Sequence, residues 1–111
     1  MIRVAFAKVK AEKVARLESW LRELMQRQDE VRETFALESV RHEQAFIIPG
    51  QEGPILIYVM EAQDHKRGRE AFQASQLLID LEHRRIMEDV LAEKIQIAPL
   101  YDCALRETGA E

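Results

Sequence analysis

The run from Ile55 to Met60 restricts the fold of this chain more than any other feature, because its residues are apolar without a polar break. Successive side chains of a strand point to opposite faces, so an extended run of this kind is apolar on both faces. A strand with one face in water would alternate apolar and polar residues instead. We therefore expect this segment in the middle of a sheet whose two faces are both covered.

The rest of the chain alternates between strand-like and helix-like patterns. Alternation with period two predicts strands, and apolar residues three and four positions apart predict amphipathic helices. In chain order we expect a strand over Ile2–Val9, a helix over Ala11–Gln28 that runs on or restarts near Asp29, a strand over Glu38–Ile48, the strand Ile55–Met60, a helix from its N-cap Asp64 to Ser75, a helix over Leu81–Lys94 and a strand over Ile95–Leu105. The glycine- and proline-rich turn 49–54 makes the middle strands a hairpin.

This order, β-α-β-β-α-β, predicts an α+β protein with the ferredoxin-like arrangement: a four-stranded antiparallel sheet with helices on one face. The first and third strands should be central, because they are the most apolar. The second strand has a charged middle and the fourth contains Pro99, both typical of sheet edges. We expect one domain over residues 1–105 and a polar tail over 106–111.

Such a sheet would leave an apolar face without helices. An exposed apolar face of this size exceeds what soluble monomers usually tolerate. We therefore expect a homodimer that packs sheet against sheet, and a bound apolar ligand covering part of the face is the alternative.

Composition narrows the environment and the partners. The net charge is −4, from 20 acidic and 16 basic residues that are interspersed, so no basic stripe predicts binding to nucleic acid. No apolar stretch approaches the ~20 residues that span a membrane. The single cysteine, Cys103, and the lack of a leader-like segment favour a cytoplasmic protein. The three histidines lack metal-ligand spacing, so we predict neither a metal nor a cofactor.

Asp80 and His83 are the first candidates for chemistry, because they lie three residues apart at a helix start. In a catalytic interpretation the carboxylate orients the imidazole, which acts as a general base. In a structural interpretation Asp80 caps the helix and His83 packs inside it. The spacing alone favours the structural interpretation, and both stay open.

A second group of candidates comes from the two middle strands. Glu38 and His42 share one face of the second strand and, facing inward with Tyr58, would join the same pocket. Glu61 ends the third strand. The alternative is that charges on an edge strand prevent unwanted pairing.

Several of these residues form a set that resembles a family of small uncharacterised bacterial and archaeal proteins, a domain of unknown function with the dimeric α/β-barrel fold. The matching positions are Glu38-Ser39-Val40, Tyr58 to Ala62 with Asp64, Ala71-Phe72, Ser75, and Ile79-Asp80 with His83. The resemblance implies a shared site at Glu38, Ser75, Asp80 and His83. We therefore expect a small-molecule pocket and a cofactor-independent enzyme using the Asp80/His83 pair, with Glu38, His42, Tyr58, Glu61 and Ser75 as ligand contacts. The alternative is a non-catalytic ligand-binding or stress-related dimer.

Overall fold

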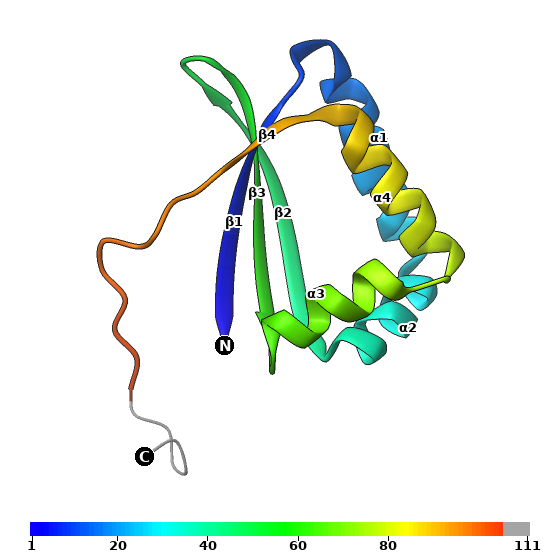
Figure 1. Ribbon diagram of the computed structural model, residues 1–111. Coiled ribbons are helices and arrows are strands. Elements are labelled where there is room, and N and C mark those ends of the chain that lie inside the picture. Colours follow the sequence, from blue (N-terminus) through cyan, green and yellow to red (C-terminus); the bar gives the residue numbers. More distant parts are fainter. Residues whose placement is uncertain (106–111) are drawn as a thin grey trace.

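The computed structural model describes residues 1–105, in which four strands form an open antiparallel sheet and four helices cover one of its faces (Figure 1). The elements are β1 (Ile2–Val9), a 3₁₀ turn (Ala11–Lys13), α1 (Val14–Gln26), α2 (Gln28–Glu38), β2 (Val40–Gly50), β3 (Gly53–Ala62), α3 (His65–Ala74), α4 (Leu78–Val90) and β4 (Leu91–Ile95). No helix in this part of the chain has the length and apolar character needed to cross a membrane. The predicted tail 106–111 lies outside the described residues.

The strand order is β2-β3-β1-β4, and all neighbouring strands are antiparallel. The prediction that the first and third strands are central and the other two lie at the edges is therefore confirmed. Two helices stand at each α position of the β-α-β-β-α-β pattern, so the element order is longer; the pair after the hairpin was predicted as two helices, and the first helix was predicted to run on or restart near Asp29. The first pair arises because α1 ends at Gln26 and the chain restarts as α2 at Gln28, close to the predicted position.

The second predicted strand was wrong at its start, and the fourth was wrong over nearly its whole length, so Pro99 lies beyond the strand. The second strand begins at Val40 rather than Glu38, because α2 continues to Glu38 and Ser39 then turns the chain with a left-handed backbone, φ 58°. The fourth strand is Leu91–Ile95 rather than Ile95–Leu105. It comes early because α4 ends at Val90, and it pairs with only half of β1.

The helix boundaries after the hairpin explain two polar side chains. Asp64 caps α3, as predicted, and its carboxylate accepts a hydrogen bond from the backbone N–H of Arg67. The next helix, α4, begins at Leu78, three residues before the predicted start. Asp80 therefore lies in the first turn, where a negative charge is favourable, and is not the N-cap.

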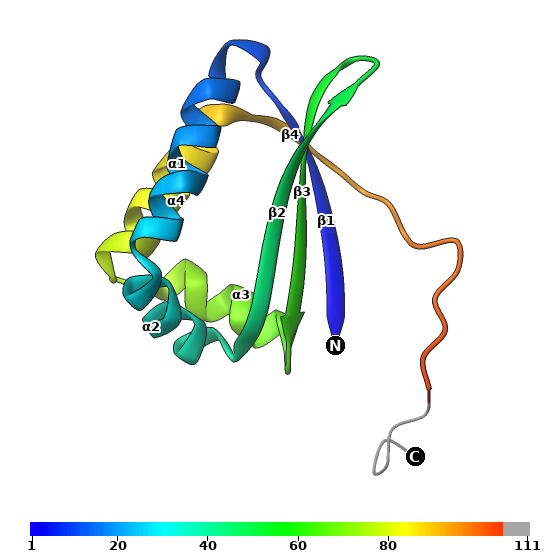
Figure 2. The ribbon, with the colours of Figure 1, turned by 180° about the vertical axis from the view of Figure 1, so that it is seen from behind.

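The core lies between the helices and the sheet. Leu17 of α1, Leu56 of β3 and Val90 of α4 are fully buried there together with Val9 of β1. Cross-strand register places alternate residues on the opposite side, which we call the open face. Its side chains are those of Ile2, Val4, Phe6 and Lys8 of β1, His42, Gln44, Phe46 and Ile48 of β2, Ile55, Ile57, Val59 and Glu61 of β3, and Glu93 and Ile95 of β4. Figure 2 shows this face without helices, and Ile2 and Phe46 are 69% and 48% exposed.

Candidate functional site

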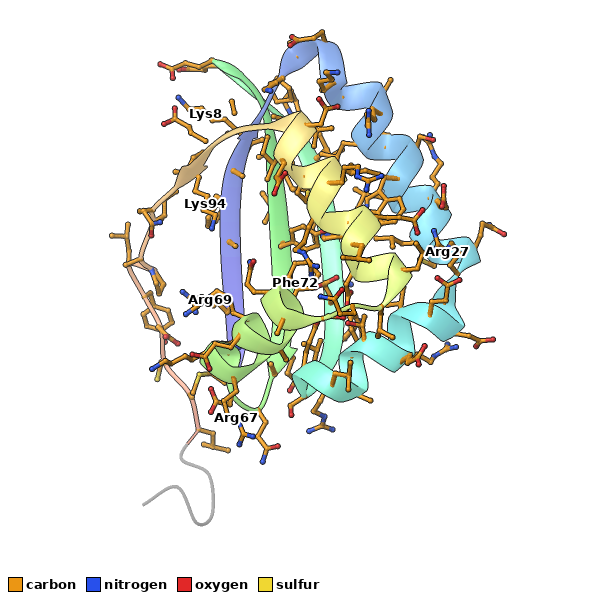
Figure 3. All side chains as sticks on the ribbon, turned by 45° about the vertical axis from the view of Figure 1, so that its right-hand side comes forward. Lys8, Arg27, Arg67, Arg69, Phe72 and Lys94 are labelled. Carbon is orange, nitrogen blue, oxygen red and sulfur yellow. The ribbon has the colours of Figure 1, made fainter. Side chains whose placement is uncertain are left out.

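The imidazole of His83 is the centre of the candidate site, and it extends from α4 into the layer between helices and sheet. Three aromatic rings surround it, with centroids 5.6 to 6.1 Å from that of the imidazole: Trp20 of α1, Tyr58 of β3 and Phe72 of α3. Figure 3 shows Phe72 in this interior layer. Three elements thus converge on one side chain of α4, and its surroundings are mainly aromatic.

The hydrogen bonds of His83 determine its tautomer. The indole Nε1–H of Trp20 donates to His83 Nδ1 over 2.8 Å, so this nitrogen must be an acceptor without a proton. The neutral ring then carries its proton on Nε2, which lies 3.3 Å from the hydroxyl oxygen of Tyr58 and donates to it. Burial lowers the pKa of His83 to about 4, although the charge of Asp80 opposes this shift. At neutral pH His83 is therefore a hydrogen-bond donor to Tyr58.

The phenol of Tyr58 is the last group of this donor chain. Because its oxygen accepts from His83, its own O–H remains free to donate. No acceptor for that proton is found among residues 1–105. Burial, reinforced by the charge of Glu43, raises the pKa of Tyr58 well above its usual value, so the phenol stays protonated. The chain Trp20–His83–Tyr58 therefore ends in a donor that is available to a further acceptor.

Glu43 stands on the same sheet face as Tyr58, and sequence reasoning missed it. In the β2–β3 register Ala45 is opposite Tyr58, so Glu43 lies diagonally beside the phenol. Burial, with a smaller contribution from the charge of Glu38, raises the pKa of Glu43 to about 7. The alternation of Glu43 with the inward-facing Ala45 and Ile47 was the signal that could have identified it.

Thr34 of α2 joins two further carboxyl groups in the interior. Its Oγ1 lies 2.9 Å from Glu38 Oε2 and 2.5 Å from Asp80 Oδ2. A hydroxyl has one proton and can donate to only one of them, so the other carboxyl must be protonated and donate to Thr34. Burial raises the pKa of Glu38 to about 7; the Thr34 hydrogen bond opposes this shift and the charge of Asp80 adds to it. Glu38 therefore binds a proton at a higher pH than an ordinary glutamate does.

None of the three inward carboxyl groups has a cation beside it. The ion pairs of residues 1–105 do not include Glu38, Glu43 or Asp80. In Figure 3 the labelled lysine and arginine side chains lie around the outside of the molecule. Arg84, the cation on α4 nearest in sequence to His83, donates instead to the backbone carbonyls of Phe72 and Ser75. Glu38 and Asp80 are thus hydrogen-bonded to the hydroxyl of Thr34 rather than paired with a cation.

Ser75 and Gly68 have positioning roles around this site. The Ser75 hydroxyl oxygen accepts from the backbone N–H of Leu77 and so stabilises the turn that starts α4. Gly68 of α3 packs on the end of α2, where an added Cβ would lie 2.8 Å from the carbonyl oxygen of Glu38. This close approach of the two helices keeps Glu38 facing the interior.

Three of the predicted relationships are not found. His42 and Glu61 are cross-strand partners on the open face, opposite to Tyr58, because the helix end at Glu38 and a bulge after Val40 shift the faces of the strand. Glu38 lies inside, but on a helix. Among the described residues no hydrogen bond joins Asp80 to His83, since Asp80 bonds Thr34 and His83 bonds Trp20 and Tyr58.

Within residues 1–105, neither depression that the structure shows contains this cluster, so the predicted pocket stays a prediction. Two surface depressions, of about 430 and 320 Å³, include no member of the cluster: the first is lined by Arg69, Glu70, Gln73 and Ala74, and the second by residues 25–30. Within residues 1–105 no three metal-ligating side chains come together. Tyr58, His83, Glu43 and Phe72 remain partly rather than completely buried. A ligand would therefore reach the cluster where these side chains meet solvent.

Replacing Trp20 by Phe should raise the pKa of His83 above about 4, because Nδ1 loses a donor that favours the unprotonated nitrogen, while burial, the main cause of the low value, still keeps it below 6.5. NMR titration of the imidazole resonances would measure this, with His42 and His65 as references. Phe72→Leu is the matched control, since it removes an aromatic contact and leaves the Nδ1 hydrogen bond. Identical titration of His83 in Trp20→Phe and the unaltered protein would contradict the tautomer assignment.

Comparison with known proteins identifies the family. The sequence model of a Family of unknown function (DUF6176) matches residues 2–105, so the chain belongs to this family, and the resemblance to an uncharacterised family is confirmed. No curated protein and no solved structure matches the chain significantly.

Proposed function

We propose that this member of a family of unknown function is a homodimer of ferredoxin-like domains, of the dimeric α/β-barrel type, with one acid–base site per protomer. Each site binds a small neutral carbonyl compound and moves a proton at the carbon next to the carbonyl, without a cofactor. The open apolar face supports the dimer, because sheet-to-sheet packing would remove it from water. The inward carboxyl groups without cations favour a neutral ligand over an anionic one.

The observation that carries the proposal is the unused O–H of Tyr58 beside a carboxyl group whose pKa is about 7. Tyr58, polarised by the Nε2–H of His83, donates to the carbonyl oxygen of the ligand. Glu43 as carboxylate removes a proton from the adjacent carbon, and the resulting enolate is stabilised by the Tyr58 hydrogen bond. Return of a proton from Glu43 to that carbon completes the exchange.

The other polar residues have supporting roles in this scheme. Trp20 fixes the tautomer of His83, so the imidazole acts as a donor rather than as the base. Burial and the charge of Asp80 favour the protonated form of Glu38, which limits the negative charge near Glu43. Buried ionisable groups of this kind lower the stability of a protein. They are nevertheless concentrated at functional sites, because function requires them there.

Exchange of the α-protons of cyclohexanone in D₂O, followed by proton NMR, tests this function. We expect the protein to accelerate exchange and Glu43→Gln to lower the rate by about 100-fold or more, because the base is lost. Glu33→Gln, an exposed change on α2, is the matched control and should retain the full rate. Pyruvate, which carries a carboxylate, should exchange more slowly than cyclohexanone. Equal rates with Glu43→Gln and the unaltered protein would refute the role of Glu43.

A further inference from the structure

The segment after β4, residues 96–105, is an extended arm whose large side chains stay exposed among residues 1–105. It leaves the sheet at Gln96 and runs along the side opposite to the helices (Figures 1 and 2). Four of its side chains are large and apolar, and all are exposed: Ile97, Leu100, Tyr101 and Leu105, with Tyr101 at 85% and Leu105 at 92%. This is a clustered apolar surface on an extended chain, unlike the scattered exposed residues of the helices.

The sheet has an unpaired edge next to the point where the arm departs. β4 pairs only with Phe6–Val9 of β1, so Ile2–Ala5 has no neighbour on that side within the described chain. The side chains of Ile2 and Val4 are exposed on the open face at the same place. An unpaired edge of a central strand accepts another extended segment readily.

The open face alone is small for a stable interface. From strand spacing and rise per residue, four strands of this length cover roughly 500 Å² in projection. A stable interface takes roughly 800 Å² from each partner. The apolar side chains of an arm contributed by each chain would supply the difference.

We propose that the arm, residues 96–105, is exchanged within the dimer: each arm crosses to the second copy and packs on the open face beside the unpaired half of its β1. This inference rests on the proposed homodimer. The occupant follows from the chain itself, because the arm and the open face are both apolar and lie on the same side of the molecule. If the arm packs on the open face, the apolar side chains of both are removed from water, which is favourable.

The single cysteine, Cys103, lies in the arm and is exposed, which allows a direct test. In a Val4→Cys variant, oxidation should join Cys103 to the new cysteine between two chains and give a species of twice the 12.9 kDa chain on a non-reducing gel. Ser19→Cys, on an exposed helix position remote from the open face, is the matched control and should not cross-link to the arm. A bond within one chain, or unreacted thiols in both positions, would overturn arm exchange.

A second measurement distinguishes a failure of arm exchange from a failure of the proposed homodimer. Leu100→Glu with Tyr101→Glu should raise the dimer dissociation constant by about 100-fold, since anchor residues dominate interfaces. Met25→Glu with Leu37→Glu, on exposed helix positions, should leave it unchanged. If sedimentation shows a dimer that the arm variant retains, arm exchange is wrong and the homodimer stands. If the unaltered protein is monomeric at micromolar concentration, both the arm exchange and the proposed homodimer are wrong.

Discussion

The protein should lose stability as the pH rises from about 5 to 8, by about 2–4 kcal/mol, and Glu43→Gln should remove most of that loss. The folded-state pKa values of Glu38 and Glu43 are raised from 4.5 to about 7, so the folded protein binds more protons than the unfolded chain between these values. Stability therefore falls as the pH rises through this window and becomes constant above it. This is opposite in sign to the behaviour of a carboxylate in an ion pair.

His83 opposes this trend in part of the window. Its pKa is lowered from 6.5 to about 4, so the unfolded chain binds the extra proton there and stability rises with pH. Because two carboxyl groups lower the stability as the pH rises and only one imidazole raises it, the net stability falls. Urea unfolding at a series of pH values would measure it, with Glu18→Gln on the exposed surface of α1 as the control. If the unaltered protein and Glu43→Gln give parallel curves, Glu43 does not titrate as proposed.

Thr34→Val should cost about 2–3 kcal/mol at pH 8, because the two carboxyl groups that share its hydroxyl are left buried without that partner. The cost should be smaller at pH 5, where protonated Glu38 can donate to another acceptor. Valine has nearly the same shape as threonine, so the change tests the hydroxyl rather than the packing.

Thr34→Ser is the control for this prediction, since it retains the hydroxyl and loses only a methyl group. Denaturant unfolding of the three proteins at both pH values gives the comparison. We expect serine to restore most of the stability lost in the valine variant. If Thr34→Ser is as unstable as Thr34→Val, the cost comes from the missing methyl contacts and the shared-proton arrangement is wrong.

Local patterns predicted most of the elements. The apolar run Ile55–Met60 identified a central strand, and the charged middle of the second strand identified an edge. Asp64 identified a helix start, because a capping carboxylate acts within three residues. Errors occurred at boundaries, as at Ser39 and Leu91, where packing decided whether a helix continued.

The candidate site was predictable only in part. Glu38, Ser75 and Asp80 are buried and Tyr58 and His83 are partly buried, while the shared site that the resemblance implies for Glu38, Ser75, Asp80 and His83 stays a prediction. Their partners could not be read from spacing, because Trp20 is 63 residues from His83 and Thr34 is 46 residues from Asp80. The face on which Glu43 lies depended on the bulge after Val40. A shift of one residue exchanges the two faces of a strand, so His42 and Glu43 changed places.

The sequence by itself determined that Ile55–Met60 must be a central strand and that one sheet face would remain apolar. These properties follow from the alternation of neighbouring side chains, which depends only on local backbone geometry. Only the tertiary structure decided that His83 is a donor, that Glu38 binds a proton at a higher pH than an ordinary glutamate does and that Glu43 rather than His42 faces Tyr58. Those outcomes depend on hydrogen bonds and burial between segments distant in the chain, where the register of the strands and the packing of the helices set each distance.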